Sequence, residues 1–160
     1  MPTRIMLMLL VAMVPGVPSA QSSADFSGTW KLMKTEPPVD AGRGGGRGGG
    51  ISGPYATTTF AQAPDTLVIA QTGNSVTVQI GSTKATFTLD NKTVATPPDD
   101  VLALKTRAHW DGAKLHLHFK QGMNWGRDIL VVSGVTLTLV RDLESGGAST
   151  TRTLTYTKAS

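Results

Sequence analysis

Apolar and polar residues alternate along most of the chain after position 65, a period of two that is typical of β-strands with one buried face. Two-residue turns are expected at Gly73-Asn74, Gly81-Ser82 and Asp90-Asn91, and each turn fixes which residues share a face. All three turns agree on one apolar face, and threonines dominate the opposite one. The residues expected on the apolar face are Leu67, Ile69, Gln71, Val76, Val78, Ile80, Ala85, Phe87, Leu89 and Val94.

The second half of the chain continues the alternation after a break at residues 95–101, which contain two prolines. Turns are expected at Asp111-Gly112 and Ser133-Gly134, with a longer connection at Gln121–Gly126 and a glycine-containing loop at Glu144–Ser149. The same inner face would then carry Leu102, Leu104, Thr106, Ala108, Trp110, Leu115, Leu117, Phe119, Leu130, Val132, Val135, Leu137, Leu139, Leu154 and Tyr156.

A sheet with this many strands must hide its apolar face, either by closing into a barrel or by folding into a sandwich. Because the strands are joined by sequential hairpins throughout, closure into a barrel is favoured over a sandwich. The opening strand, Asp25–Lys34, contains Gly28-Thr29-Trp30, and its indole needs a closed sheet for burial. The last strand, Thr150–Lys158, is expected to pair with it. The predicted fold is all-β: one domain over residues 25–158, an antiparallel up-and-down meander of about 8–10 strands closing into a small barrel.

Residues 1–20 have the pattern of a secretory signal peptide: an early charge at Arg4, an apolar stretch over Ile5–Val14, and small residues up to Ala20. The apolar stretch is about ten residues long, whereas a membrane-spanning helix needs ~20, so a retained anchor is the weaker alternative. Cleavage is expected between residues 19 and 24. The mature protein would have no membrane span and would be periplasmic or extracellular.

The segment Gly42–Gly50 is too rich in glycine for a strand or helix and is expected to be a flexible loop. Arginine and glycine in alternation can bind RNA, but the segment is short, lacks aromatic residues and follows an export signal. A net charge of +4 is also too small to indicate nucleic-acid binding. The chain has no cysteine, which excludes disulfides and thiolate metal sites.

The segment Phe26–Leu32 resembles the start of lipocalin-like domain proteins that many bacteria export, which open with a Gly-x-Trp strand soon after a signal peptide. Ala108–Leu115 and Arg152–Lys158 are similar to the same group. The resemblance implies a small antiparallel barrel and, more loosely, a binder of small apolar molecules. In lipocalins an arginine from near the final strand lies across this indole, which makes Arg141 and Arg152 the candidates here.

Three histidines, His109, His116 and His118, are expected on the outer face of one hairpin, in an arrangement that zinc or copper could use. No carboxylate lies within this pattern, and the charge of the neighbouring basic residues opposes cation binding. A solvated basic strip is therefore the preferred interpretation, and no metal site is predicted. The basic residues expected on this face are Lys105, Arg107, Lys114 and Lys120.

The sequence contains no recognisable catalytic arrangement. A Gly-x-Ser-x-Gly elbow and a phosphate-binding glycine loop are both missing, and most acidic residues fall at turns. Trp125, expected in a loop, is the tryptophan most available to a partner. No catalytic residue and no cofactor are predicted, so the protein is expected not to be an enzyme.

The leading hypothesis is an exported lipocalin-like protein that binds a small hydrophobic molecule inside the barrel. The expected wall residues are Leu104, Trp110, Leu117 and Phe119. Small barrels are often filled by their own side chains. The alternative is therefore a filled barrel that serves as an interaction or structural module of the cell envelope, through its threonine-rich and basic outer faces. The sequence identifies neither the ligand nor a protein partner.

Overall fold

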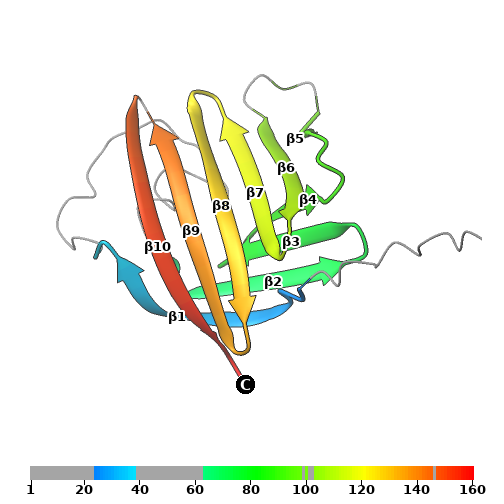
Figure 1. Ribbon diagram of the computed structural model, residues 1–160. Coiled ribbons are helices and arrows are strands. Elements are labelled where there is room, and N and C mark those ends of the chain that lie inside the picture. The colour runs from blue at the N-terminus through cyan, green and yellow to red at the C-terminus, as the bar shows by residue number, and fades with distance from the viewer. Residues whose placement is uncertain (1–23, 39–62, 99, 101–102, 146) are drawn as a thin grey trace, which may run out of the picture.

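The computed structural model describes residues 24–38, 63–98, 100, 103–145 and 147–160, and the expected signal peptide and the expected flexible loop at Gly42–Gly50 lie outside them. The described residues form ten antiparallel strands in one sheet and contain no helix (Figure 1). The strands are β1 (Gly28–Glu36), β2 (Thr66–Thr72), β3 (Ser75–Ile80), β4 (Thr83–Thr88), β5 (Val94–Thr96), β6 (Leu104–Asp111), β7 (Lys114–Gln121), β8 (Asn124–Ser133), β9 (Thr136–Ser145) and β10 (Ala148–Lys158). None of these residues belongs to a helix long and apolar enough to cross a membrane.

The strand order is β4-β3-β2-β1-β10-β9-β8-β7-β6-β5, so the first and last strands pair as the sequence predicts. Strands β6 to β10 stand side by side in Figure 1, and β1 to β3 run across them. The sheet curls until β4 meets β6, where the Thr106 hydroxyl donates to the Thr86 carbonyl at 3.2 Å. Next to it the Asn91 N–H donates to the Ala108 carbonyl at 3.0 Å. The barrel is therefore nearly closed, and this seam between β4 and β6 joins the two ends of the strand order.

Two of the predicted turns, Gly73-Asn74 and Gly81-Ser82, are confirmed by the strand register. Two others are displaced by one residue, to positions 112–113 and 134–135, because Asp111 pairs with Lys114 and Ser133 pairs with Thr136. In all four turns glycine takes the first central position, and in the two displaced turns its φ is +58°, the left-handed conformation that this position demands. One consequence is that Val135 lies in a turn, exposed, and not on the inner face.

Three further predictions about connections are wrong. Gln121 pairs with Asn124, so a tight turn replaces the expected loop and Trp125 belongs to β8, where it lies half-exposed on the outer face. Strand β9 continues to Ser145 and β10 starts at Ala148, so Glu144 and Ser149 pair within the sheet and are not part of a loop. No hairpin forms at Asp90-Asn91: the chain crosses the seam at this point, and β5 pairs with β6 at the edge of the sheet. Edge position explains why Val94 is exposed.

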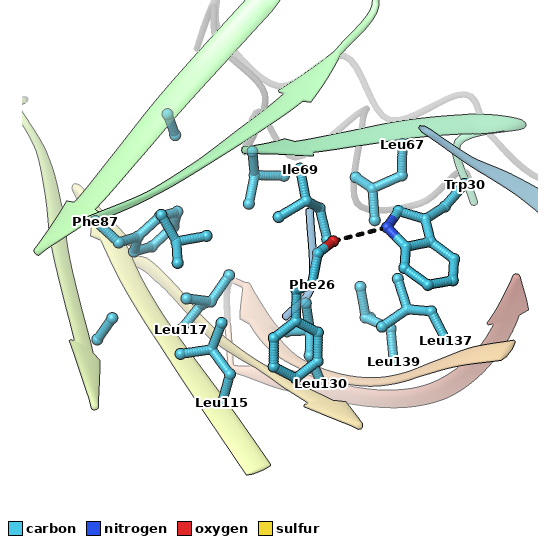
Figure 2. Close-up of a cluster of buried hydrophobic side chains, with 14 of the residues drawn as sticks. Phe26, Trp30, Leu67, Ile69, Phe87, Leu115, Leu117, Leu130, Leu137 and Leu139 are labelled. Carbon is cyan, nitrogen blue, oxygen red and sulfur yellow. Dashed lines mark hydrogen bonds between the residues drawn. The ribbon is translucent and has the colours of Figure 1, made fainter. Parts of the chain in front are cut away.

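The Trp30 side chain is fully buried and anchors one end of the core (Figure 2). Its indole N–H donates to the Phe26 carbonyl at 2.9 Å, and the Phe26 ring packs 5.7 Å from the ring of Trp110. The Lys158 ammonium lies 5.6 Å from the centre of the Trp30 ring. A cation therefore lies over the indole as expected, but it is a lysine, and Arg141 forms an ion pair elsewhere in the barrel.

Most of the rest of the inner face is also apolar, as the alternation predicts. Its side chains converge on one cluster, and burial of each large one contributes roughly 1.5–3 kcal/mol to folding. Fully or almost fully buried members are Leu67, Ile69, Val76, Val78, Phe87, Leu115, Leu117, Leu130, Leu137, Leu139, Leu154 and Tyr156.

A substitution at Gly126 can test this packing, because Gly126 lies opposite Phe119 in the β7–β8 pair. A Cβ atom at Gly126 would overlap the Phe119 ring and lie 2.9 Å from the Asp142 carbonyl oxygen. We expect Gly126→Ala to lower the free energy of unfolding by about 1–3 kcal/mol, the usual penalty of overpacking. Urea denaturation followed by tryptophan fluorescence measures this. The double variant Gly126→Ala/Phe119→Leu should recover part of the loss, and an unchanged midpoint for Gly126→Ala would contradict the close approach.

Candidate functional site

The four predicted wall residues all lie on the inner face of one hairpin, β6–β7. Leu117 and Phe119 on β7 are buried, at 1% and 4% exposed. Leu104 and Trp110, near opposite ends of β6, are partly buried and pack against the core cluster. The sequence thus placed these side chains on the correct face, and the structure brings all four to one wall of the interior.

A polar row continues this wall across the next three strands. Asp128 on β8 is the register partner of Leu117, Arg141 on β9 is the partner of Asp128, and Arg152 on β10 is the partner of Arg141. Directly paired residues in antiparallel strands point to the same face, so these side chains share the inner face with Leu117. We call Asp128, Arg141 and Arg152 the inner charged row.

The centre of this row is a buried bidentate ion pair. Arg141 donates from Nε to Asp128 Oδ1 at 2.8 Å and from Nη2 to Asp128 Oδ2 at 2.7 Å. Asp128 is 1% exposed and Arg141 is 3% exposed. Such a pair persists in a low-dielectric interior because the parallel hydrogen bonds offset much of the desolvation of both charges.

The formal charge of the row is positive, since it has two guanidinium groups and one carboxylate. The hydroxyl of Tyr156, two positions beyond Leu154 on β10, is also buried, and no hydrogen-bond partner for it exists among the described residues. Burial raises the pKa of Tyr156, so the phenol stays protonated and can donate a hydrogen bond. Arginine and tyrosine donors in an apolar interior are suited to an anionic group.

Sequence reasoning missed the ion pair. The alternation that placed Leu130 and Leu139 inside also places Asp128 and Arg141 inside, two positions along each strand. The available signal was that two neighbouring strands each carry a charged residue at an inner position, and that the two charges are opposite. The resemblance to lipocalins instead assigns Arg141 to Trp30, as a cation over the indole.

The three histidines form a second cluster, on the outer face of the same β6–β7 hairpin. His109 is the register partner of His116, and His118 follows two positions along β7. The ring of His109 stacks on the other two, with centroid distances of 4.9 Å to His116 and 5.2 Å to His118. One ring nitrogen from each residue lies within 4.8 Å of the others.

The cluster is less solvated and less uniformly basic than the sequence suggested. All three histidines are only partly exposed. Asp111 Oδ2 lies 3.8 Å from His116 Nε2, so a carboxylate is present, contrary to expectation. Arg127, which faces His118 from β8, is paired with Asp142 at 2.6 Å.

Two of the histidines are held neutral. Burial lowers the pKa of His118 to about 4, with smaller contributions from Arg107 and the neighbouring histidines. Burial also lowers the pKa of His116, and His109 adds to the effect, while Asp111 opposes it. Neutral imidazoles at pH 7 are the form that binds metal ions.

The barrel is similar to several solved structures. One is described as the REP1-NXSQ fatty acid transporter, with a TM-score of 0.58, 20% identity, and coverage of 86% of this chain and 98% of that one. Another is apo lipid binding protein 8 of Caenorhabditis elegans, with a TM-score of 0.55, 16% identity, and coverage of 84% and 95%. A third is the Schistosoma mansoni fatty acid binding protein in complex with arachidonic acid, with a TM-score of 0.52, 15% identity, and coverage of 84% and 96%.

At these identities the likeness establishes the fold, and it confirms the predicted antiparallel up-and-down barrel. No protein-family model matches the chain. No curated protein sequence matches it either.

The energetics of the ion pair can be measured by a double-mutant cycle. Asp128→Leu leaves the buried Arg141 without this carboxylate, so we expect a loss of about 3–5 kcal/mol in the free energy of unfolding. The double variant Asp128→Leu/Arg141→Met replaces both charges by apolar groups and should regain most of that stability. Urea denaturation of the two single variants and the double variant gives the coupling. An Asp128→Leu variant as stable as the parent protein would contradict a buried pair.

The neutral histidines predict a pH dependence of stability. The pKa of His118 is about 4 in the folded protein, against an ordinary value of 6.5. Between these values the unfolded chain binds a proton that the folded chain does not, so stability is lost as pH falls from 6.5 to 4. His118→Gln should lose less stability over this window in thermal or urea unfolding. If the stability of the parent protein and of His118→Gln fell equally between pH 6.5 and 4, the result would contradict the burial of His118.

Proposed function

We propose that this protein binds a small hydrophobic acid inside the barrel, with the hydrocarbon against the β6–β7 wall and the acid group at the inner charged row. The observation that carries the proposal is the combination of Arg141, Arg152 and the buried Tyr156 hydroxyl with the Asp128 carboxylate on the inner face of the barrel. An anionic group would balance the formal charge of the row and could accept a hydrogen bond from Tyr156. Guanidinium groups bind carboxylates with good geometry.

The structural neighbours support this class of ligand. Their descriptions name a fatty acid transporter, a lipid binding protein and a complex with arachidonic acid. In this chain Leu117 is adjacent to Asp128 across the β7–β8 pair, so the apolar wall and the polar row meet at one point. A molecule with an apolar body and an acidic end matches this arrangement.

The proposed setting is outside the cytoplasm. The signal-peptide pattern of residues 1–20 supports export to the periplasm or the exterior, and the Gly-x-Trp opening strand supports a relationship to exported bacterial lipocalin-like proteins. We propose that the protein carries or sequesters its ligand without catalysis.

A second candidate is the filled barrel that acts as an interaction module. The observation in its favour is the number of fully buried side chains that converge on the centre, among them Trp30, Phe87 and Leu130 (Figure 2). Trp125, half-exposed on the outer face of β8, would then be part of the interaction surface. This candidate predicts that no small molecule enters the barrel.

The proposed function is tested by calorimetric titration of the mature protein with octanoate, dodecanoate and hexadecanoate, and with the alcohols of the same lengths. A hydrogen bond to a charged group contributes about 1.5–3 kcal/mol, so the acids should bind roughly tenfold or more tightly than the alcohols. Arg152→Met removes one positive charge of the row and keeps the Asp128–Arg141 pair. It should reduce the preference for acids.

The matched control is Lys84→Met, which removes a positive charge from the exposed outer face of β4. It should leave binding unchanged. Equal affinity for acids and alcohols would contradict the role of the row, and no binding of either series would favour the filled barrel.

A further inference from the structure

We propose that His109, His116 and His118 bind one divalent transition-metal ion, of the class of Zn²⁺, on the outer face of the β6–β7 hairpin. These are all the histidines in the chain. The strand register alone brings them together: His109 lies opposite His116, and His118 extends from the same face of β7.

The geometry is close to that of a three-histidine site. One ring nitrogen of each residue lies within 4.8 Å of the others. Tetrahedral zinc with Zn–N distances of about 2.0–2.1 Å places its nitrogen ligands roughly 3.3 Å apart. Each nitrogen needs to move by about 1 Å to reach this spacing, and the stacked rings must also turn about their side-chain χ angles so that the lone pairs, which lie in the ring planes, converge on one ion.

The ring nitrogens are available to a ligand. His109 Nδ1, His116 Nε2 and His118 Nε2 are buried, and the described residues offer none of them a hydrogen-bond partner. Buried polar atoms are normally satisfied, so three such nitrogens in one cluster indicate a missing ligand. Neutral imidazole nitrogens prefer zinc, copper and nickel to the hard ions calcium and magnesium.

The surrounding charges allow a cation here. Arg127, which faces His118 across the β7–β8 pair, is already paired with Asp142. Asp111 is 71% exposed in its side chain and lies 3.8 Å from His116 Nε2. Its carboxylate can reach the fourth coordination position or hold a water molecule there. Arg107 and Lys114 remain close to the histidines, which will weaken binding relative to a site without basic neighbours.

This site is independent of the proposed ligand. Alternate residues of β6 and β7 point to opposite faces, so the histidines lie outside the barrel and the wall residues lie inside. Metal binding is therefore expected to leave the binding of hydrophobic acids unchanged.

The test uses the mature protein without a histidine tag, titrated with Zn²⁺ in competition with a chromogenic chelator. We expect one Zn²⁺ per chain, and we expect His109→Gln and His118→Gln each to weaken binding at least tenfold. Co²⁺ should give visible absorption bands of a tetrahedral site. The matched control is Lys120→Gln, which removes a positive charge two residues beyond His118 on the outer face of β7 and should bind Zn²⁺ at least as well as the parent protein.

A second measurement does not depend on the folding of any variant. Addition of one equivalent of Zn²⁺ to isotope-labelled protein should shift the imidazole nitrogen signals of all three histidines together, and Mg²⁺ should not. The absence of stoichiometric Zn²⁺ binding at micromolar concentrations would overturn the proposal. Binding that persists unchanged in His109→Gln and His118→Gln, or shifts confined to a single histidine, would overturn it as well.

Discussion

Burial of the Trp30 indole depends on strands from both ends of the chain. Trp30 pairs with Leu67 in β2 and with Lys158 in β10, so the first strand joins the N-terminal and C-terminal halves of the sheet. The indole N–H is satisfied by the Phe26 carbonyl, and Lys158 covers the ring. Without β1 the two halves would each have an open edge and an exposed apolar face. The barrel interior exists because this strand is held on both sides.

Successive side chains of β6 and β7 point to opposite faces of the sheet. This alternation places the apolar wall and the histidine cluster on opposite sides of one hairpin. The inner residues of β6 and β7 form an apolar wall that ends at Asp128, and the outer residues include the three histidines. A side chain on one face cannot contact the other without a shift in register, and such a shift would expose Leu117 and Phe119. The packing of the wall therefore also holds the histidines in place.

Sequence periodicity predicted the faces of the strands well, because the period of two is a direct consequence of strand geometry. It placed Leu104, Trp110, Leu117 and Phe119 inside and His116 outside, as the structure shows. Turns were less predictable, since a shift of one residue leaves the pattern of the strands almost unchanged. At the displaced turns the decisive feature was the glycine with positive φ at the first position.

Features that depend on contacts between strands were beyond the sequence. Periodicity could place Asp128 and Arg141 inside, but only the β8–β9 register puts them opposite one another and shows a bidentate pair. Likewise, the shared face of the histidines was predictable, whereas their burial and the nearby Asp111 carboxylate were not. The seam between β4 and β6 also follows from the curvature of the whole sheet, which no local pattern encodes.

The central claim is that the interior holds a hydrophobic molecule with an acidic group. Native mass spectrometry of the protein purified from its own cells, followed by solvent extraction and identification of what is released, tests it most directly. We expect a complex of one chain with one carboxylate-bearing hydrophobic molecule. A ligand-free mass under every growth condition, or release of neutral molecules alone, would contradict it.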